Sequence, residues 1–440
     1  MAWKTDTLTG WGRVLSGSAQ IARPEKPSAI ARVVADTPAP AVGAQRSYGD
    51  PAINTDGKAI DMNRLDRFIS FDAKTGVLEA EAGVSITQML QTFAPQGWMP
   101  TVMPGTGFAT LGGCIANDAH GKNHHGVGTF GQYVISIELI GADGKTKTVT
   151  PKKNKTLFEA TVGGLGQTGI IISAKIQLTE CSSRLIQVDE RRATNLSEFM
   201  DMLKSSTATY CVGWIDGTAN GQSLGRGILE EAELTKSNMA PKLRKSRKVP
   251  FNAPSFALSP PTVRAFNRMY FNRVPATGRG VLRSLEDFFF PLDKIHDWNK
   301  LYGKRGFHQF QCVLPDDTAE RTLREMLRLI ADSGLASPLA VLKRTGPGRA
   351  GPLSFTMEGF TLALDFPNSA KSIKLVETLN EMTTEAGGRI YFAKDSLATA
   401  KQAHAMYPEL AAWQKTVKTA DPKGHFKTDL VRRLKLRDSK

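Results

Sequence analysis

Residues 104–125 read PGTGFATLGGCIANDAHGKNHH, a stretch dense in glycine and small side chains that ends among three histidines. Small side chains let a backbone approach a large planar or phosphorylated ligand closely, and glycine permits the turns that aim N–H groups at a phosphate. Such a composition makes a poor hydrophobic core. We therefore expect residues 104–125 to form part of a cradle for a cofactor.

The 440 residues, 41% of them hydrophobic, are enough for roughly two to four domains and a sizeable core. The four cysteines are widely spaced and form no CxxC pair, which fits a reducing compartment and predicts neither a zinc site nor a disulfide framework. Residues 1–13 lack the profile of a signal peptide, and no apolar run approaches the ~18 residues that span a bilayer. We expect a soluble or peripheral protein, in the cytoplasm or at the inner membrane, with a periplasmic location left open.

The net charge of +15 favours anionic partners such as nucleic acid, anionic lipid headgroups or phosphorylated substrates. Most basic residues are scattered, but one run, PKLRKSRKVP, concentrates them at 241–250. This run is either a solvated, mobile loop or a segment attracted to a membrane surface or to phosphate. No aromatic residues interleave with its charges, which argues against nucleic acid as a partner.

Two patterns of secondary structure follow one another along the chain. Over residues 28–182, short apolar runs alternate with turns; a helix capped by Ser85 is predicted at 85–97 and a hairpin at 142–150. The second pattern predicts, in order, strand 308–315, helix 317–333, strands 339–345 and 360–366, helix 370–386 and strand 389–393. This β-α-β-β-α-β order is typical of a ferredoxin-like unit, and the residues after 400 are predicted to be helical.

The motif GLGQTG at 164–169 matches the GxGxxG expression of a dinucleotide-binding turn. That turn needs a strand before it and a helix after it, so that the helix N-terminus faces the pyrophosphate. Here the preceding KTLFEATVG has a helical pattern, and the following IIISAKIQL is strand-like. The context is reversed, so we reject a Rossmann nicotinamide site at this position.

Three segments read together resemble, in order and spacing, the FAD-binding domain of the vanillyl-alcohol oxidase and p-cresol methylhydroxylase superfamily: GAQRSYGD (43–50), PGTGFATLGGCIANDAHG (104–121) and VGGLGQTGII (162–171). With PLSF, LDFP, YFAKDS and HAMYP, the chain resembles one family of that group, the decaprenylphosphoryl-β-D-ribose 2′-oxidases, which are the flavin subunits of a 2′-epimerase. The resemblance implies an α+β fold of two domains, with an FAD-binding domain at 1–183 and an antiparallel-sheet substrate domain at 184–388. A C-terminal segment, 389–440, would return to the FAD domain.

The resemblance also implies an activity. FAD would oxidise the 2′-hydroxyl of a polyprenyl-phosphoryl-β-D-ribose to the 2-keto sugar, the first half of an epimerisation that makes the arabinose donor for cell-wall glycans. Hydride would pass to the flavin, and a separate NAD(P)H-dependent short-chain reductase would reduce the ketone. Peripheral membrane contact would suit the lipid-linked substrate, and nucleic acid is not expected. The alternatives are a sugar-alcohol or aldonolactone oxidase of the same superfamily, and a basic nucleic-acid or membrane-binding protein without catalysis.

The resemblance assigns the FAD contacts to the first loop, to the glycine-rich segment and to two positions further along the chain. These residues are Ala41, Val42, Gly43, Ala44, Gln45, Arg46, Ser47, Tyr48, Gly49, Asp50, Pro51, Gly105, Thr110, Leu111, Gly112, Gly113, Asn117, Asp118, Ala119, His120, Ile171 and Tyr391. Arg46 stands where many members of the superfamily carry the histidine that bonds covalently to the flavin. We therefore expect noncovalent FAD.

Lys394, in YFAKDS, is the candidate for the central catalytic group. A lysine near a flavin acts either as a base, if burial depresses its pKa, or as a charged anchor for the substrate, whereas an arbitrary lysine lies at the surface. His120 is the histidine expected beside the flavin, while His124 and His125 are equally explained as polar loop residues. Asp118 alone is thin support for a metal site, so none is expected.

Gln309 and Gln311 alternate with Phe310 on one predicted strand and therefore face the same side. They lie either on an exposed edge facing water or in a clamp for sugar hydroxyls. The resemblance adds Tyr48, Trp214, Lys343 and Tyr391 to the substrate pocket. The chain departs from the family on the substrate side, with Phe289 and Phe290 in place of an aromatic hydroxyl and a histidine, Thr361 in place of an asparagine, and Ala363 in place of a cysteine.

Overall fold

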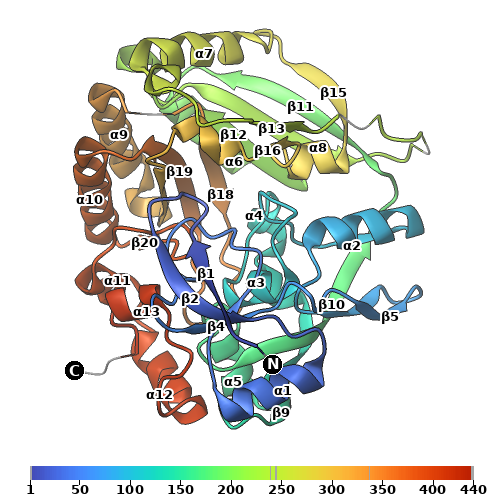
Figure 1. The fold of residues 1–440 in the computed structure, drawn as a ribbon. Coiled ribbons are helices and arrows are strands. Elements are labelled where there is room, and N and C mark those ends of the chain that lie inside the picture. The colour runs from blue at the N-terminus through green and yellow to red at the C-terminus, as the bar shows by residue number, and fades with distance from the viewer. Residues whose placement is uncertain (1, 238, 243–244, 336, 438–440) are drawn as a thin grey trace.

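A computed structural model describes residues 2–237, 239–242, 245–335 and 337–437. Figure 1 shows a lower part, built from the N-terminal strands and the C-terminal helices, and an upper part built around a large sheet. The sheet changes between β10 (Ile170–Glu180) and β11 (Leu185–Ala193), so the expected domain boundary at 183 falls in the link between these two strands. Leu243 and Arg244 of the basic run at 241–250 lie outside the described residues.

The N-terminal portion of the lower part, described from residue 2 to the end of β10, contains two sheets and five short helices. The first sheet has the order β1 (Lys4–Thr9), β2 (Ser16–Ala22), β4 (Lys58–Asp61) and β3 (Ala41–Val42). The second has the order β5 (Phe68–Asp72), β6 (Val77–Glu81), β10, β8 (Val134–Ile140) and β9 (Thr146–Val149), with β7 (Trp98–Pro100) also paired to β10. The helices are α1 (Pro27–Asp36), α2 (Ile86–Phe93), α3 (Leu111–Ala116), α4 (His124–Val127) and α5 (Lys155–Thr161).

Several sequence predictions for the lower part are confirmed. Ser85 caps α2 in a reciprocal capping box with Gln88, and β8 and β9 pair as the expected antiparallel hairpin. GLGQTG follows helix α5 and precedes strand β10, so the reversed context is confirmed.

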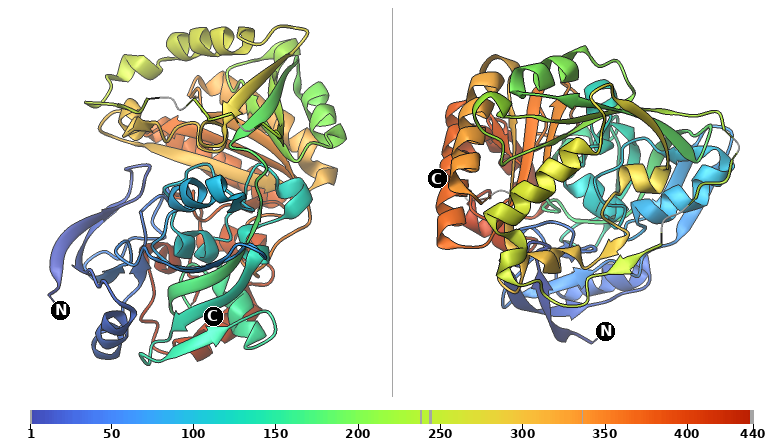
Figure 2. Two further views of the ribbon diagram at one scale, coloured as in Figure 1. Left: turned by 90° about the vertical axis from the view of Figure 1, so that its right-hand side faces the viewer. Right: turned by 90° about the horizontal axis from the view of Figure 1, so that it is seen from above.

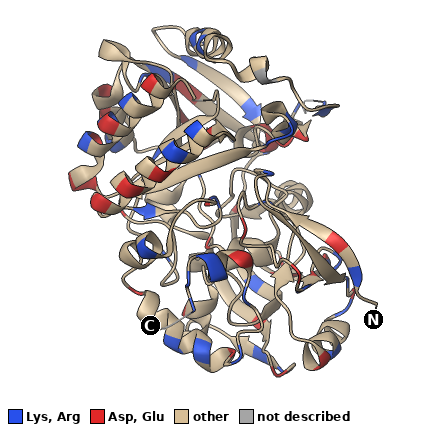
Figure 3. Ribbon diagram, turned by 60° about the vertical axis from the view of Figure 1, so that its left-hand side comes forward, with Lys and Arg blue, Asp and Glu red and all other residues tan. Residues whose placement is uncertain are grey.

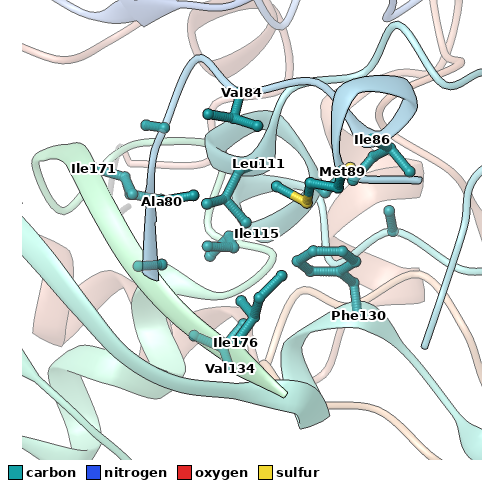
Figure 4. Close-up of a cluster of buried hydrophobic side chains, with 14 of the residues drawn as sticks. Ala80, Val84, Ile86, Met89, Leu111, Ile115, Phe130, Val134, Ile171 and Ile176 are labelled. Atoms are coloured by element: carbon teal, nitrogen blue, oxygen red, sulfur yellow. The ribbon is translucent and has the colours of Figure 1, made fainter. Parts of the chain in front are cut away.

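The expectation that residues 104–125 make a poor hydrophobic core does not hold for one face of α3. Leu111 and Ile115 are fully buried in the lower core, where they pack among strand residues such as Ala80 and Ile176 (Figure 4). The neighbouring Gly112 and Gly113 line a cavity instead. A six-residue helix therefore separates its side chains into a core face and a ligand face, which composition alone does not reveal.

The upper part is an eight-stranded sheet with the order β15-β11-β13-β12-β18-β19-β17-β20. Its remaining strands are β12 (Tyr210–Ile215), β13 (Gly227–Leu234), β15 (Arg279–Ser284), β17 (Phe307–Leu314), β18 (Ala340–Thr345), β19 (Gly359–Pro367) and β20 (Arg389–Ile390). Its helices are α6 (Leu196–Ser205), α7 (Pro260–Asn272), α8 (Leu285–Phe289), α9 (Asp316–Ser333) and α10 (Ala370–Glu385). The element order β17-α9-β18-β19-α10-β20, with antiparallel strands in the spatial order β18-β19-β17-β20, confirms the ferredoxin-like unit.

The last strand of that unit ends earlier than predicted. β20 stops at Ile390, and the chain then turns downward toward the first FAD loop, where Tyr48 N–H donates to the Ala393 carbonyl over 2.9 Å. Lys394 N–H closes the turn on the Tyr391 carbonyl at 2.8 Å. This turn, rather than a strand, carries Lys394 to the boundary between the two parts.

Of the C-terminal helices, α11 (Ala400–Met406) contacts α10 and β20 of the upper part, whereas α12 (Leu410–Ala420) and α13 (Asp429–Arg433) lie against the lower part. Trp413 Nε1 donates to the Ala160 carbonyl at 3.0 Å, and Gln167 Nε2 donates to the Phe426 carbonyl at 2.6 Å. These two bonds join the part of the chain around α12 and Phe426 to the N-terminal half.

Candidate active site

A cavity of about 1490 Å³ lies between the lower and upper parts. Its lower wall comes from the first loop, the glycine-rich segment and the turn of GLGQTG. Its upper wall comes from β12, β17, β18 and β19 of the large sheet and from the chain around α7 and α8. Loops from one half and a sheet face from the other thus enclose a single space, which is a common arrangement for cofactor and substrate sites.

Most of the residues expected to hold FAD line this cavity: Ala41, Gly43, Ala44, Gln45, Arg46, Ser47, Tyr48, Pro51, Gly105, Thr110, Gly112, Gly113, Asn117, Ala119, His120, Ile171 and Tyr391. Five of the expected residues do not line it: Val42, Gly49, Asp50, Leu111 and Asp118. Val42 and Leu111 are buried in hydrophobic cores, and Gly49 lies against the Asp395 carbonyl. Asp50 pairs with Arg433, and the buried Asp118 carboxylate accepts from the amides of Gly131 and Ala350 and from the Ser354 hydroxyl.

The lower wall fits a large cofactor by two independent features. A Cβ added at Gly105 or Gly166 would meet no atom within 4 Å, so these glycines border open space inside the cavity. Asn117 Oδ1 and Arg46 Nε are buried without a hydrogen-bond partner among the described residues, and both side chains line the cavity. Buried polar atoms normally form hydrogen bonds, so these two unpaired atoms indicate that a polar ligand binds at this wall.

Lys394 lies inside the cavity, with its Nζ 3.7 Å from the centre of the Tyr48 ring. Burial lowers the pKa of Lys394 to about 7, and the nearby Asp365 carboxylate opposes that shift. A lysine with such a pKa gives or takes a proton at neutral pH, which an exposed lysine does not.

Asp365 stands on the same sheet face, anchored by two hydrogen bonds. Gln309 Nε2 donates to Asp365 Oδ1 at 2.6 Å, and the Tyr302 hydroxyl donates to Oδ2 at 3.1 Å. Burial raises the pKa of Asp365 to about 7, although these bonds and the charge of Lys394 act in the opposite direction. Two groups of opposite type with pKa values near neutrality therefore face one cavity.

His120 joins the two walls of the cavity. Its Nδ1 lies 3.1 Å from Lys343 Nζ, and its Nε2 lies 3.1 Å from Gln311 Nε2, which also reaches Thr361 Oγ1 at 3.3 Å. Burial and the charge of Lys343 hold the pKa of His120 well below its usual range, so the imidazole is neutral. Burial, with the charges of Lys122 and Lys394, lowers the pKa of Lys343 to about 7.

The remaining candidates for the substrate side also line the cavity. Trp214 packs on Tyr270 of α7 with ring centres 4.7 Å apart, and the Tyr391 ring lies 5.6 Å from the His120 ring. Gln309 and Gln311 face the cavity rather than bulk water, so the exposed-edge alternative is wrong. Of the family departures, Phe289, Thr361 and Ala363 line the cavity, whereas Phe290 does not and instead packs beside Gly107.

Sequence reasoning missed several residues that the fold brings into the cavity. Asp365 could have been predicted from the sequence, because it lies two residues after Ala363 on a strand whose alternate side chains share one face. Lys122 lies in the quoted glycine-rich segment, where burial lowers its pKa to about 8 and its Nζ sits 3.9 Å above the Phe288 ring. Trp11 and Phe108, which flank the Arg46 guanidinium at 4.4 and 5.1 Å, carried no signal in the sequence.

The other two histidines of the glycine-rich segment make ordinary contacts. His124 Nδ1 accepts from Gly346 N–H at 3.1 Å, and His125 Nε2 lies 2.8 Å from the Ala208 carbonyl. Within the described residues, no group of three His, Cys, Asp or Glu side chains could hold a metal ion. These histidines help join the glycine-rich segment to the upper sheet.

The glycine-bordered lower wall and the ionisable upper wall define an FAD-dependent oxidoreductase, and residues 18–150 match the FAD binding domain family. The chain belongs to the family of the decaprenylphosphoryl-β-D-ribose oxidase of Mycolicibacterium smegmatis, to which it is 36% identical over an alignment of 453 positions that covers 98% of each protein. An uncharacterized protein of Streptomyces coelicolor is 31% identical over 80% of this chain and 100% of its own length. The mouse L-gulonolactone oxidase is 26% identical over 37% of this chain and 36% of its own length.

We predict that acid precipitation of the holoprotein will release its FAD into the supernatant. Arg46 cannot form the histidine–flavin bond, and it is already packed between Trp11 and Phe108. The measurement is the flavin absorbance of pellet and supernatant after acid treatment. Yellow colour that stays with the washed pellet would contradict noncovalent binding.

Proposed function

We propose that this chain oxidises the 2′-hydroxyl of a polyprenyl-phosphoryl-β-D-ribose to the 2-keto sugar. The observation that carries the proposal is the position of Lys394, which a turn holds over Tyr48 between the glycine-rich wall and the sheet face of Gln309, Gln311 and Asp365. A proton acceptor, hydrogen-bonding amides and a flavin-sized space thus meet in one cavity. The similarity to a decaprenylphosphoryl-β-D-ribose oxidase over 98% of the chain supports this choice of substrate.

Bound FAD supplies the acceptor for the hydride that leaves the sugar carbon. In its neutral form, Lys394 Nζ takes the proton of the reacting hydroxyl, and the Asp365 carboxylate stabilises the ammonium that forms. Gln309 and Gln311 orient the neighbouring hydroxyls, and neutral His120 links Gln311 to Lys343 so that this face keeps its shape. Lys122, whose pKa of about 8 leaves it mostly protonated at neutral pH, adds positive charge beside the site, which suits a phosphorylated substrate.

The proposed reaction has two consequences for partners and location. A 2-keto sugar needs a separate hydride donor to become the arabinose epimer, so we expect a distinct NAD(P)H-dependent short-chain reductase to act on the product. No helix of the described residues is long and apolar enough to cross a membrane. A polyprenyl carrier is confined to a bilayer, and we therefore infer peripheral contact with a membrane surface.

Anaerobic titration of the holoprotein with polyprenyl-phosphoryl ribose is expected to bleach the oxidised flavin in proportion to the substrate added. The polyprenyl phosphate without its sugar serves as the matched control and is expected to leave the spectrum unchanged. No bleaching by the lipid-linked ribose, together with bleaching by a free alditol or aldonolactone, would overturn the proposal in favour of a sugar-alcohol or aldonolactone oxidase.

A further inference from the structure

The positive charge of the chain is concentrated in one stretch longer than the basic run at 241–250. Residues 234–285 contain eleven Lys and Arg and no Asp or Glu. Eleven of the surplus of 15 positive charges therefore lie here, and the rest of the chain is close to balanced. Figure 3 shows the same contrast, since α7 carries blue without red while α9 and α10 carry both colours. So strong a local asymmetry favours an anionic partner.

Some of these cations serve the fold and are not available to a partner. Arg273, Arg279 and Arg283 all pair with the buried carboxylate of Glu190 on β11. Four others are exposed: Arg264 and Arg268 on α7, and Lys245 and Arg247 in the basic run. In the part of the chain that the structure describes, these four form no ion pair. The four side chains therefore present their positive charge to the solvent.

Apolar side chains are exposed in the same region. Of the eleven large hydrophobic residues that are exposed among the described residues, eight fall between positions 239 and 301. Phe256, in the short helix η4 (Ser255–Leu258) before α7, is 72% exposed, and Met269 on α7 is 65% exposed. Apolar groups gathered in this way mark an interaction surface.

α7 is fixed on the sheet by one face and presents the other to solvent. Val263 and Asn267 are buried, and Asn267 Nδ2 donates to Asp216 Oδ1 on the sheet side at 2.7 Å. Arg264, Arg268 and Met269 lie on the outer face. The helix lies at the top of the molecule in Figure 1 and faces the viewer in the right-hand view of Figure 2. An interfacial helix has this combination of basic and apolar outward side chains.

The same helix borders the entrance of the active-site cavity. Phe266 and Tyr270, stacked with ring centres 5.9 Å apart, line the cavity from α7. Arg247 on β14 (Arg247–Lys248), Lys245 just before this strand, and the exposed Ile295 on β16 (Ile295–His296) also line it. The cavity therefore reaches the surface between α7 and the β14–β16 pair, through a rim that is both basic and apolar.

We propose that η4 and the outer face of α7 dock on an anionic lipid bilayer, with Arg264 and Arg268 among the headgroups and Phe256 and Met269 in the interface. The two arginines also border a second hollow beside the Arg226–Asp216 ion pair, and their two charges suit the phosphate of a headgroup. The carrier lipid then enters between α7 and β14–β16 while its chain remains in the bilayer. This last step rests on the proposed function, whereas the docking itself needs no turnover.

Co-sedimentation of the holoprotein with vesicles tests the docking. We expect binding to phosphatidylcholine vesicles that contain phosphatidylglycerol, weak binding to pure phosphatidylcholine, and loss of binding at high salt. The double variant Arg264→Gln/Arg268→Gln is expected to bind on the order of tenfold more weakly, because each basic residue near a charged surface adds to the partition. Phe256→Ser/Met269→Ser is expected to weaken binding even at low salt, since it removes the apolar contact.

The matched control is Lys152→Gln/Lys153→Gln, which removes two exposed lysines from the loop between β9 and α5 in the lower part. It is expected to bind vesicles like the parent, and the flavin spectrum and circular dichroism of every variant verify folding. Equal binding by parent and arginine variant, or no vesicle binding by the parent, would overturn the proposal, and the latter would favour a protein partner for this surface. Bleaching by a detergent-solubilised substrate tests the proposed function separately, so the two failures are distinguishable.

Discussion

The variant Lys394→Met is expected to turn over polyprenyl-phosphoryl ribose at least about a hundredfold more slowly while it retains FAD. A positioned proton acceptor contributes roughly 10²–10⁴-fold to a rate, and methionine keeps the apolar stem of lysine without the amine. The Tyr48 ring, which lies 3.7 Å from Lys394 Nζ, keeps a side chain of similar length beside it. The measurements are steady-state kcat and KM and the ratio of flavin to protein.

The matched control for this experiment is Lys401→Met on α11, where the lysine is exposed. Its turnover and flavin content are expected to equal those of the parent. Normal turnover by Lys394→Met with normal flavin content would remove Lys394 from the reaction. A rise in KM alone, with kcat unchanged, would identify Lys394 as an anchor for the substrate rather than a proton acceptor.

The pH profile of the parent separates these two roles as well. A base must be deprotonated to act, and the pKa of Lys394 is about 7, so kcat/KM is expected to rise with pH through about 7 and then level off. A charged anchor would give the opposite result, a fall above pH 7. Because burial also brings the pKa values of Lys343 and Asp365 to about 7, the rising limb is assigned to Lys394 only if it disappears in Lys394→Met and persists in Lys343→Met and Asp365→Asn.

The variant Arg433→Ala is expected to lower the free energy of unfolding by about 3–5 kcal/mol, because it leaves two buried carboxylates without their cation. The Arg433 guanidinium donates to Asp50 at 2.7 and 2.9 Å, to Asp395 at 2.9 Å and to the Ala398 carbonyl at 2.8 Å. Asp50 ends the first FAD loop, and Asp395 follows Lys394. The loss is therefore expected to reach the active site and to weaken FAD binding as well. Urea denaturation followed by circular dichroism, with flavin titration, measures both effects.

The neighbouring residue provides the control. Arg432 pairs with Asp429 and Asn54 at the surface, where its side chain is 44% exposed, and an exposed pair of this kind contributes about 1 kcal/mol or less. Arg432→Ala is therefore expected to unfold nearly like the parent. Similar small losses for the two variants would show that the Arg433 cluster is not the joint between the C-terminal segment and the FAD loop.

Local signals predicted a large share of the fold. The cap at Ser85, the hairpin after β8 and the order of the ferredoxin-like unit each depend on residues close together in sequence, and the structure confirms them. Where a prediction differed, a distant contact was the cause. β20 is shorter than expected because the Tyr48 N–H donates a hydrogen bond to the Ala393 carbonyl and the chain leaves the sheet. These two residues are far apart in sequence.

For the candidate site as well, local sequence patterns predicted some features and distant contacts decided the others. The alternation of Gln309 and Gln311 predicted that both side chains share one face of the strand. It did not predict whether that face is exposed, because this depends on how β17 is placed relative to the lower part. Asp118 lies between two residues that line the cavity, yet its carboxylate faces away, because three hydrogen-bond donors from other segments hold it. Neighbours in sequence do not predict the direction of such a side chain.

By itself, the sequence determined the strand and helix pattern, the glycine-bordered cofactor wall and the family to which the chain belongs, since motifs and periodicity are local properties. Only the tertiary structure decided that Lys394, Lys343 and Asp365 are buried in one cavity with pKa values near 7, and that the free basic residues gather around α7 at its entrance. The physical reason is that burial and electrostatic potential depend on which distant segments meet. A carboxylate or an amine acquires its chemistry from neighbours that its own stretch of sequence does not contain.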